Sequence, residues 1–171
     1  MNITLIGMSG VGKSFIGKKL ASKLKFNFLD LDKVIEKKFN KTLQQIIDEI
    51  GEEKFLEVEE KAILSLGKID NCIICPGGSC VYSKKGMNFL KSISKIVFLN
   101  DSLENIKKKA GDISKRGIIG LKNKTFDELF KERFILHKKY SDLKIELIEN
   151  FALKDAVVNK VLKLLDTPGV G

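Results

Sequence analysis

The sequence predicts an α/β fold of three layers, in which helices cover both faces of a five-stranded parallel sheet. Short apolar segments of strand length alternate with amphipathic segments of helical length along the chain. Hydrophobic residues make up 43% of the 171 residues, which is enough to form a buried core of ordinary domain size. No internal repeat or linker interrupts the alternation, so we expect a single domain over residues 1–171.

The first strand, expected over 3–6, leads into a glycine-rich loop, 7–14, and the loop into an amphipathic helix, 12–24. The spacing G-x-x-x-x-G-K-S places glycine where the backbone must turn with positive φ and lie close to a polyphosphate. Lys13 would bring a positive charge to the β- and γ-phosphates, and the Ser14 hydroxyl would bind Mg²⁺. The alternative, a glycine-rich turn without a ligand, does not explain why strand, loop, Lys-Ser pair and helix occur in this order. The expected nucleotide contacts in this stretch are Gly7, Ser9, Gly10, Val11, Gly12, Lys13, Ser14 and Phe15.

The second strand, expected over 26–31, ends in two carboxylates, Asp30 and Asp32. Residues at i and i+2 of a strand project to the same side, and open α/β sheets bind ligands at the carboxyl ends of their strands. The pair is therefore expected beside the phosphate-binding loop, where a Mg²⁺ ligand and a general base are needed. In the alternative interpretation, Asp32 only caps a helix that starts at Lys33.

Two helices are predicted next. Thr42 and Gln45 have the spacing of a capping box, which opens a helix that ends at Gly51. A longer helix is expected over 52–66. Its inward face is expected to consist of Phe55, Val58, Ala62 and Leu66.

The third strand, expected over 71–75, is followed by the turn Gly77-Gly78-Ser79. A glycine pair after a core strand marks the close approach of another backbone or of a ligand. The residues alone leave a structural turn and a substrate-contacting turn equally open.

The fourth strand, expected over 95–99, precedes a helix over 102–109 and then a polar, glycine-containing segment, 110–124, that carries Arg116. This composition suits a mobile lid. A second capping box at Thr125 starts the next helix, which carries Arg133 and His137. A fifth strand over 144–148 and a closing helix complete the pattern. The apolar face of the closing helix is expected to consist of Leu153, Val157, Val161 and Leu164.

Composition and charge exclude several classes of protein. The net charge is +9, but the lysines are spread over nearly every helix without interleaved aromatic residues, so we expect no nucleic-acid partner. No apolar run is long enough to span a membrane, and the N-terminus passes directly into a strand, so we expect no signal peptide and no membrane partner, and a cytoplasmic protein. The thiols of Cys72, Cys75 and Cys80 are expected to be buried and reduced, since no second metal-binding pair accompanies them.

Arginine is rare in this lysine-rich chain. Only Arg116 and Arg133 occur, and a planar guanidinium is favoured over an ammonium where phosphate or carboxylate must be bound through two parallel hydrogen bonds. Both arginines are therefore candidate site residues.

Taken together, these motifs resemble the shikimate kinase family, within the wider class of P-loop kinases for small molecules and nucleoside monophosphates. The resemblance covers about residues 1–147. Besides the phosphate-binding loop, it rests on the following stretches: Asp30-Leu31-Asp32, Gly51 to Glu59, Gly77-Gly78-Ser79, Lys115 to Ile119, and Arg133 to His137.

The resemblance implies a monomeric enzyme that uses ATP and Mg²⁺ to phosphorylate a small hydroxylated acid, with the 3-hydroxyl of shikimate as the expected acceptor. It places Mg²⁺ at Ser14 and, through water, Asp30, and the accepting hydroxyl at Asp32. Segment 32–61 would bind the acceptor and 110–124 would form the lid. Catalysis would depend on Lys13, Asp32 and Arg116, the nucleotide would also contact Lys109 and Arg116, and the acceptor would also contact Gly77, Gly78, Ser79 and Arg133.

Four positions depart from the family pattern. Leu56 stands where an arginine usually helps to bind the substrate carboxylate, and the sequence leaves open whether Lys54 or Lys61 replaces it. The other departures are Ser79 for glycine, Gly117 for proline and His137 for tyrosine, the last expected to be a surface or packing residue. Two alternatives follow from Leu56: a kinase for another acceptor, such as gluconate or a nucleotide, or a catalytically weak relative that binds nucleotide.

Overall fold

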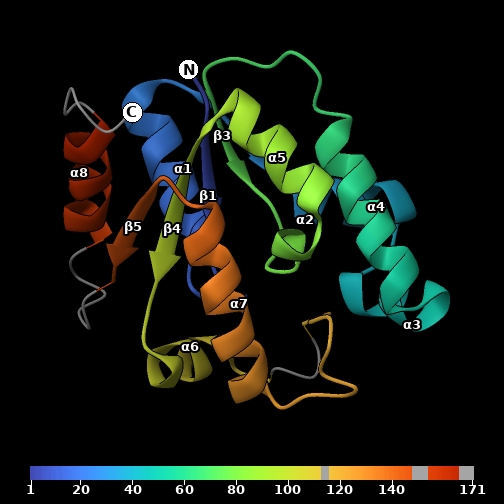
Figure 1. Cartoon of the computed structure of the whole chain (residues 1–171). Coiled ribbons are helices and arrows are strands. Elements are labelled where there is room, and N and C mark those ends of the chain that lie inside the picture. Colours follow the sequence, from blue (N-terminus) through green and yellow to red (C-terminus); the bar gives the residue numbers. More distant parts are fainter. Residues whose placement is uncertain (113–115, 148–153, 166–171) are drawn as a thin grey trace.

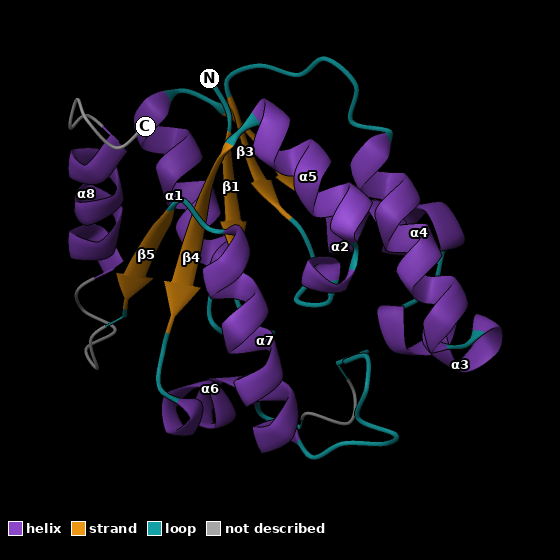
Figure 2. Cartoon of the chain, in the orientation of Figure 1, coloured by secondary structure: helices purple, strands orange, loops and turns teal. Residues whose placement is uncertain are grey.

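The computed structural model describes residues 1–112, 116–147 and 154–165 (Figure 1). Within these ranges one sheet of five parallel strands forms the centre of the molecule, in the spatial order β2-β3-β1-β4-β5 (Figure 2). The predicted three-layer α/β fold is confirmed. The strands are β1 Ile3–Ile6, β2 Asn27–Asp30, β3 Cys72–Cys75, β4 Lys95–Asn100 and β5 Leu143–Glu146.

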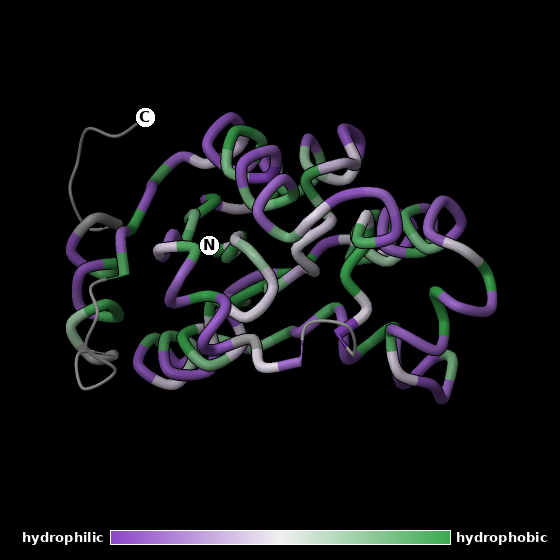
Figure 3. The backbone as a smooth tube through the Cα atoms, turned by 90° about the horizontal axis from the view of Figure 1, so that it is seen from below, coloured by the Kyte–Doolittle hydropathy of each residue, from purple (hydrophilic) through white to green (hydrophobic). Residues whose placement is uncertain are grey.

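Helices cover both faces of this sheet. Those described are α1 Lys13–Leu24, α2 Leu31–Phe39, α3 Leu43–Ile50, α4 Glu52–Leu64, the 3₁₀ helix η1 Cys80–Tyr82, α5 Lys84–Ile93, α6 Leu103–Ala110, α7 Phe126–Tyr140 and α8 Lys154–Leu165. Helices α1 and α8 pack on one face, and α5 and α7 on the other, so the strands β1, β3 and β4 are buried between them (Figure 1). Seen from below in Figure 3, apolar residues gather between the layers.

Helices α2, α3 and α4 form a separate projection beside the β2 edge of the sheet (Figure 1). It has its own apolar cluster, which includes Ile35, Ile46, Ile47 and Phe55. The same cluster contains Ile119, from the segment that was predicted to form a lid. The projection and the lid segment therefore pack together at the end of the molecule where the strands point.

Several element boundaries agree with the sequence predictions. Both capping boxes are present, at Thr42 and at Thr125, and α3 ends at Gly51, whose φ is 83°. The closing helix lies where it was expected, with Val161 buried and Val157 half-buried. Leu153 and Ile148 lie outside the described residues, as does the side chain of Leu164.

The geometry predicted for Asp30 and Asp32 was wrong. Strand β2 ends at Asp30, which is the N-cap of α2 and accepts a hydrogen bond from the Lys33 amide at 3.3 Å. Asp32 lies in the first turn of that helix, so the two carboxylates are not i and i+2 of one strand, and the helix is not capped by Asp32. The N-cap belongs to the last extended residue, whose side chain can reach an amide that lacks a partner within the helix.

The inward face of α4 also differs from the prediction. The buried row is Phe55, Glu59 and Ile63, whereas Val58 and Ala62 are half-buried, and the helix ends at Leu64. A glutamate therefore lies in the middle of a buried helix face. Because lone charged residues are rarely buried, this position calls for a partner or a function.

Two further predictions can be compared with the structure. Cys72, Cys75 and Cys80 are free and buried, as expected. In the ranges that the structure covers, no helix is both long and apolar enough to cross a membrane.

Candidate active site

The phosphate-binding loop has the backbone that its glycines predict. Gly7, Gly10 and Gly12 have φ values of 150°, 87° and 103°. A Cβ on Gly7 would lie 2.5 Å from the Leu99 carbonyl oxygen, so the loop also needs glycine there to pass the end of β4. The loop joins the carboxyl end of β1 to the N-terminus of α1, where partial positive charge favours a bound anion.

Lys13 lies over this loop. Its Nζ donates hydrogen bonds to the carbonyl oxygens of Gly7 and Met8, at 2.8 and 3.1 Å. The ammonium is therefore held at the point where a polyphosphate would meet the loop.

Two other predicted nucleotide contacts differ in the part that they expose. The Val11 side chain is buried in the main core and its amide donates to the Met8 carbonyl at 3.2 Å, so only backbone is presented at this position. Phe15, in contrast, is 44% exposed, and the Lys19 ammonium lies 5.4 Å from the centre of its ring.

The two predicted metal ligands are in contact. The Ser14 hydroxyl donates to Asp30 Oδ2 at 2.6 Å, from the first turn of α1 to the end of β2. Two oxygen ligands side by side next to a phosphate-binding loop suit Mg²⁺, which takes hydroxyl, carboxylate and phosphate oxygens in preference to nitrogen or sulfur.

Asp32 and Glu59 converge on the turn after β3. A Cβ on Gly77 would lie 2.3 Å from Glu59 Oε1 and 2.7 Å from Asp32 Oδ1, so only glycine leaves room for both carboxyl groups. Within the described residues, Asp32 Oδ1 is buried without a hydrogen-bond partner.

Burial raises the pKa of Asp32 to about 6, and nearby Asp30 raises it further while Lys13 opposes the shift. Burial likewise raises the pKa of Glu59 to about 7, with Asp32 adding to the rise.

The turn itself binds the surrounding elements together. The Ser79 hydroxyl donates to Glu59 Oε2 at 2.5 Å, which ties the turn to α4. A Cβ on Gly78 would lie 3.1 Å from the Ser9 amide nitrogen and 3.4 Å from Arg133 Nη1. The backbone at Gly78 thus lies between the phosphate-binding loop and the second candidate arginine.

Arg133 is buried, with 1% of its surface exposed. Its Nη2 donates to the Ile119 carbonyl at 2.6 Å and its Nε to the Tyr82 hydroxyl at 3.3 Å, and the guanidinium lies 5.2 Å from the centre of the Tyr82 ring. No carboxylate of the described residues forms an ion pair with it. A buried guanidinium that faces a cavity without a paired carboxylate is suited to an anionic ligand.

The described part of the predicted lid, 116–124, is held across the site. The Gly117 amide donates to Gln44 Oε1 and the Gly120 amide to Glu52 Oε1, both at 3.0 Å. Ile118 and Ile119 are buried. Gly117 has a φ of 62°, and a Cβ there would lie 2.8 Å from Leu43 Cβ, so the proline usual in the family would not fit this backbone.

Arg116 and Lys109 lie next to each other at the end of α6. Arg116 is exposed, and its Nη2 donates to the Lys109 carbonyl at 3.3 Å. The Lys109 ammonium forms an ion pair with Asp101, which is itself buried at the end of β4.

These side chains surround one small cavity, of about 20 Å³. Its lining includes Ser9, Asp32, Glu59, Gly77, Gly78, Ser79, Arg116, Gly117, Ile119 and Arg133. That volume is about the size needed for one water molecule, so a larger ligand requires the lid segment to move outward. The predicted acceptor residues and the lid arginine are thus brought to one place.

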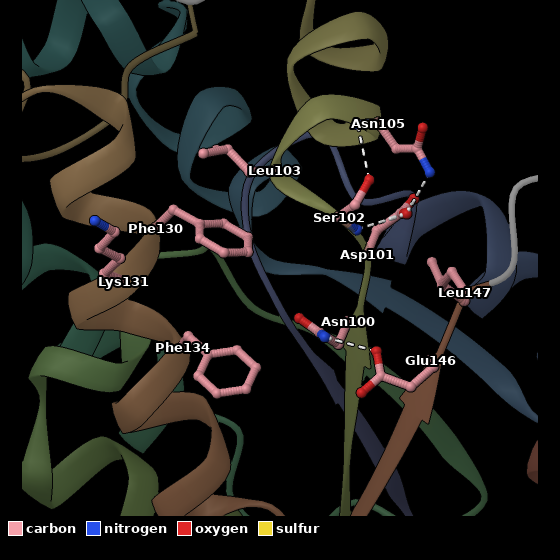
Figure 4. Close-up of a pocket in the computed structure, with 10 residues that line it drawn as sticks. All are labelled: Asn100, Asp101, Ser102, Leu103, Asn105, Phe130, Lys131, Phe134, Glu146 and Leu147. Atoms are coloured by element: carbon pink, nitrogen blue, oxygen red, sulfur yellow. Dashed lines mark hydrogen bonds between the residues drawn. The ribbon is translucent and has the colours of Figure 1, made fainter.

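A larger, open groove of 760 Å³ lies elsewhere, where β4 and β5 end (Figure 4). Phe130 and Phe134 of α7 line one side of it, and Asn100 and Glu146 of the strand ends line the other. None of the predicted site residues lines this groove, so the candidate active site is the smaller cavity.

The sequence did not identify Glu59 as a site residue. The available signal was its position four residues after Phe55 and four before Ile63, on the buried face of α4. Leu56 is half-buried and packs against the apolar cluster of the α2–α4 projection. Lys54 and Lys61 are both exposed, so neither supplies the guanidinium that the family usually has at position 56.

His137 is a packing residue and not a surface residue. Its ring stacks on Phe98, with the ring centres 5.0 Å apart and the planes at 12°. The Arg133 carbonyl is near enough to favour a proton on the ring, but within the described residues neither ring nitrogen makes a hydrogen bond of ordinary geometry. Burial dominates and lowers the pKa of His137 to about 3, which keeps the ring neutral.

Comparisons with known proteins agree with this geometry. The family model described as shikimate kinase matches residues 9–166. A shikimate kinase of Francisella tularensis subsp. novicida is 34% identical over 167 residues, which cover 96% of this chain and 94% of that protein. One from Clostridium botulinum is 31% identical, with 95% and 96% covered. The structure of shikimate kinase from Acinetobacter baumannii in complex with shikimate matches with a TM-score of 0.87 and 28% identity, over 96% of this chain and 92% of that one.

Proposed function

Since the chain belongs to the shikimate kinase family, we propose that it transfers the γ-phosphoryl group of ATP to the 3-hydroxyl of shikimate. The observation that carries the proposal is Arg133, a buried guanidinium that no described carboxylate pairs with, in the same cavity as Asp32. Such a cavity offers one group for the carboxylate of the acceptor and another for its reacting hydroxyl. The fold brings both next to the phosphate-binding loop, through the contact of Gly78 with Ser9.

The loop and the first turn of α1 bind the phosphates of ATP. Backbone amides of Gly7, Ser9, Gly10, Val11 and Gly12 are the expected donors, and Lys13 moves from the loop carbonyls to the β- and γ-phosphate oxygens. Phe15, exposed beside the loop, contacts the nucleotide. At the other side, the aliphatic part of Lys109 lies over the adenine while its ammonium stays paired with Asp101.

Ser14 and Asp30 hold Mg²⁺, the Asp30 carboxylate through a water molecule. Their adjacent oxygens, 2.6 Å apart, supply hard ligands on the side where the phosphates enter. When bound, Mg²⁺ neutralises charge on the β- and γ-phosphate oxygens.

Asp32 accepts the proton of the reacting hydroxyl. Its Oδ1 faces the cavity without a protein partner, and its raised pKa, about 6, gives a stronger base than an ordinary aspartate while leaving it ionised at neutral pH. Arg116, on the same cavity, stabilises the charge of the transferring phosphoryl group. Arg133 binds the acceptor carboxylate, and the turn Gly77-Gly78-Ser79 forms the floor of the acceptor site.

The absence of charge at Leu56 favours a second candidate, the same phosphoryl transfer to a different acceptor such as gluconate or a nucleotide. One arginine rather than two on the acceptor side asks less of the substrate's anionic group. A catalytically weak relative that only binds nucleotide is disfavoured, because Asp30, Asp32 and Arg116 are all kept around the cavity.

We propose that the working unit is a monomer in the cytoplasm. One chain supplies all the candidate site residues, and the free thiols of the described chain fit a reducing compartment.

The test is an ATPase assay, coupled to ADP release, with a panel of acceptors. The proposal expects shikimate to raise the rate far above background hydrolysis, while gluconate and nucleoside monophosphates do not. A rate that responds to one of the other acceptors and not to shikimate would transfer support to the second candidate.

A further inference from the structure

Glu59 is a buried carboxylate to which the proposed reaction assigns no role. It lies on the inward face of α4 between Phe55 and Ile63, with 4% of its surface exposed. Burying a charge in this way is costly unless a partner or a ligand compensates for it. Its presence on an otherwise apolar helix face therefore requires an explanation.

One half of the Glu59 carboxylate has a partner. Ser79 donates its hydroxyl to Oε2 at 2.5 Å. The exposed lysines on the same helix lie elsewhere, and Leu56, one turn earlier, is apolar and packs with the α2–α4 cluster. A neutral hydroxyl therefore fixes the carboxylate without cancelling its charge.

The other half faces the acceptor cavity. Oε1 points toward Gly77, where the absent side chain leaves space, and Asp32 Oδ1 points into the same space from α2. Because both oxygens lie within 3 Å of one point, they are close enough to accept hydrogen bonds from two hydroxyls on neighbouring carbon atoms. Arg133 stands at the same cavity and carries the opposite charge.

The ligand that complements this arrangement has a carboxylate and a pair of adjacent hydroxyl groups. We propose that Glu59 is a specificity-determining residue, which accepts a hydrogen bond from the 4-hydroxyl of shikimate while Asp32 binds the neighbouring 3-hydroxyl, and that Ser79 holds Glu59 in place for this contact. The inference rests on the proposed function, since it names the acceptor of that same site.

The alternative is that Glu59 is structural and only ties the turn to α4. The two roles differ in one measurable property, the preference for shikimate over an analogue that lacks the 4-hydroxyl. A structural role affects both substrates equally, whereas a direct contact is lost only for the substrate that has the hydroxyl.

The experiment measures kcat/KM for shikimate, 4-deoxyshikimate and 5-deoxyshikimate, with the unmodified protein and with Glu59→Ala, Glu59→Gln and Ser79→Ala. The unmodified protein should prefer shikimate over the 4-deoxy analogue by about 10- to 150-fold, the range for a hydrogen bond to a charged group. In Glu59→Ala this preference should fall below about 3-fold, and Glu59→Gln and Ser79→Ala should lie between. The preference over 5-deoxyshikimate should stay unchanged in all variants.

Glu57→Ala, an exposed position on the same helix, is the matched control and should keep the full 4-hydroxyl preference. Urea unfolding of every variant identifies any that does not fold, and if Glu59→Ala is one of these, Glu59→Gln decides. A folded Glu59 variant that keeps the full preference would overturn the inference. If the unmodified protein turns over none of the three acids, the proposed function itself has failed, which is a separate result.

Discussion

Arg133 donates a 2.6 Å hydrogen bond to the carbonyl oxygen of Ile119. The bond joins the helix that supplies the acceptor-binding arginine to the segment that lies across the cavity. Because Arg133 has more donors than this bond uses, one guanidinium can bind the acceptor carboxylate and also hold the segment. Acceptor binding and the position of the lid are therefore coupled through a single side chain.

Replacing Arg133 is expected to weaken acceptor binding in both ground and transition states. Arg133→Ala should raise the KM for shikimate by roughly 10- to 150-fold, the range for a charged hydrogen bond. Arg133→Lys keeps the charge but not the planar fork, so its KM should lie between. Steady-state kinetics measure this, with exposed Lys138→Ala of α7 as the control. An unchanged KM for shikimate in a folded Arg133→Ala variant would contradict the assignment.

Replacing Arg116 is expected to act on the chemical step. The charge on the transferring phosphoryl oxygens is stabilised mainly in the transition state, so Arg116→Ala should lower kcat by on the order of 10³-fold. The Kd for shikimate, measured by calorimetry, should change little. Lys122→Ala, exposed in the same segment, is the control. A variant that keeps more than about a third of the parental kcat would show that Arg116 does not meet the phosphoryl group.

Glu59 should make stability depend on pH. Its pKa is about 7 in the folded chain, above the 4.5 of an ordinary glutamate, because burial disfavours the charged form. The stability it contributes is therefore complete below pH 4.5 and is lost as the pH rises through 7.

Glu59→Gln removes this titration. The free energy of unfolding of Glu59→Gln, relative to the parent, should rise between about pH 5 and about pH 8, by up to about 3 kcal/mol. Urea unfolding at the two pH values measures it, with Glu57→Gln as an exposed control. Parallel stability curves for parent and variant would mean that the Glu59 pKa is not raised.

His137 should be a site of stabilising substitution. Its ring is buried against Phe98 and neither nitrogen has a hydrogen-bond partner in the described chain. His137→Phe keeps an aromatic ring of similar shape and removes two buried polar atoms, so it should stabilise the fold by about 1–3 kcal/mol. His137→Ala, which leaves a cavity, should destabilise it. The midpoint of urea unfolding reports both, and a lower midpoint for His137→Phe would contradict the account.

The phosphate-binding loop and the arginines show what the sequence could predict. The loop follows from glycine spacing and the Lys-Ser pair, because positive φ and close approach leave few other residues possible. The importance of Arg133 followed from the scarcity of arginine in a lysine-rich chain. Each of these signals depends on local backbone or on composition, which a sequence contains directly.

Glu59 and Ile119 show what it could not. A glutamate within a helix normally indicates a solvated face, and its burial is set by the packing of α4 against the turn after β3. Ile118 and Ile119 stand in a polar, glycine-containing segment, and their burial depends on the distant α2–α4 projection. The roles of Asp30 and Asp32 were misassigned because a strand end and a helix start differ by one residue there.

The central claim is that the cavity of Asp32 and Arg133 directs phosphoryl transfer to one hydroxyl of shikimate. The most direct test is to incubate the protein with ATP, Mg²⁺ and shikimate and to identify the product by ³¹P and ¹H NMR, beside Asp32→Asn. The account predicts shikimate 3-phosphate in an amount equal to the ADP released, and almost none from Asp32→Asn. ATP hydrolysed without a phosphorylated acid, or phosphate on another hydroxyl, would contradict it.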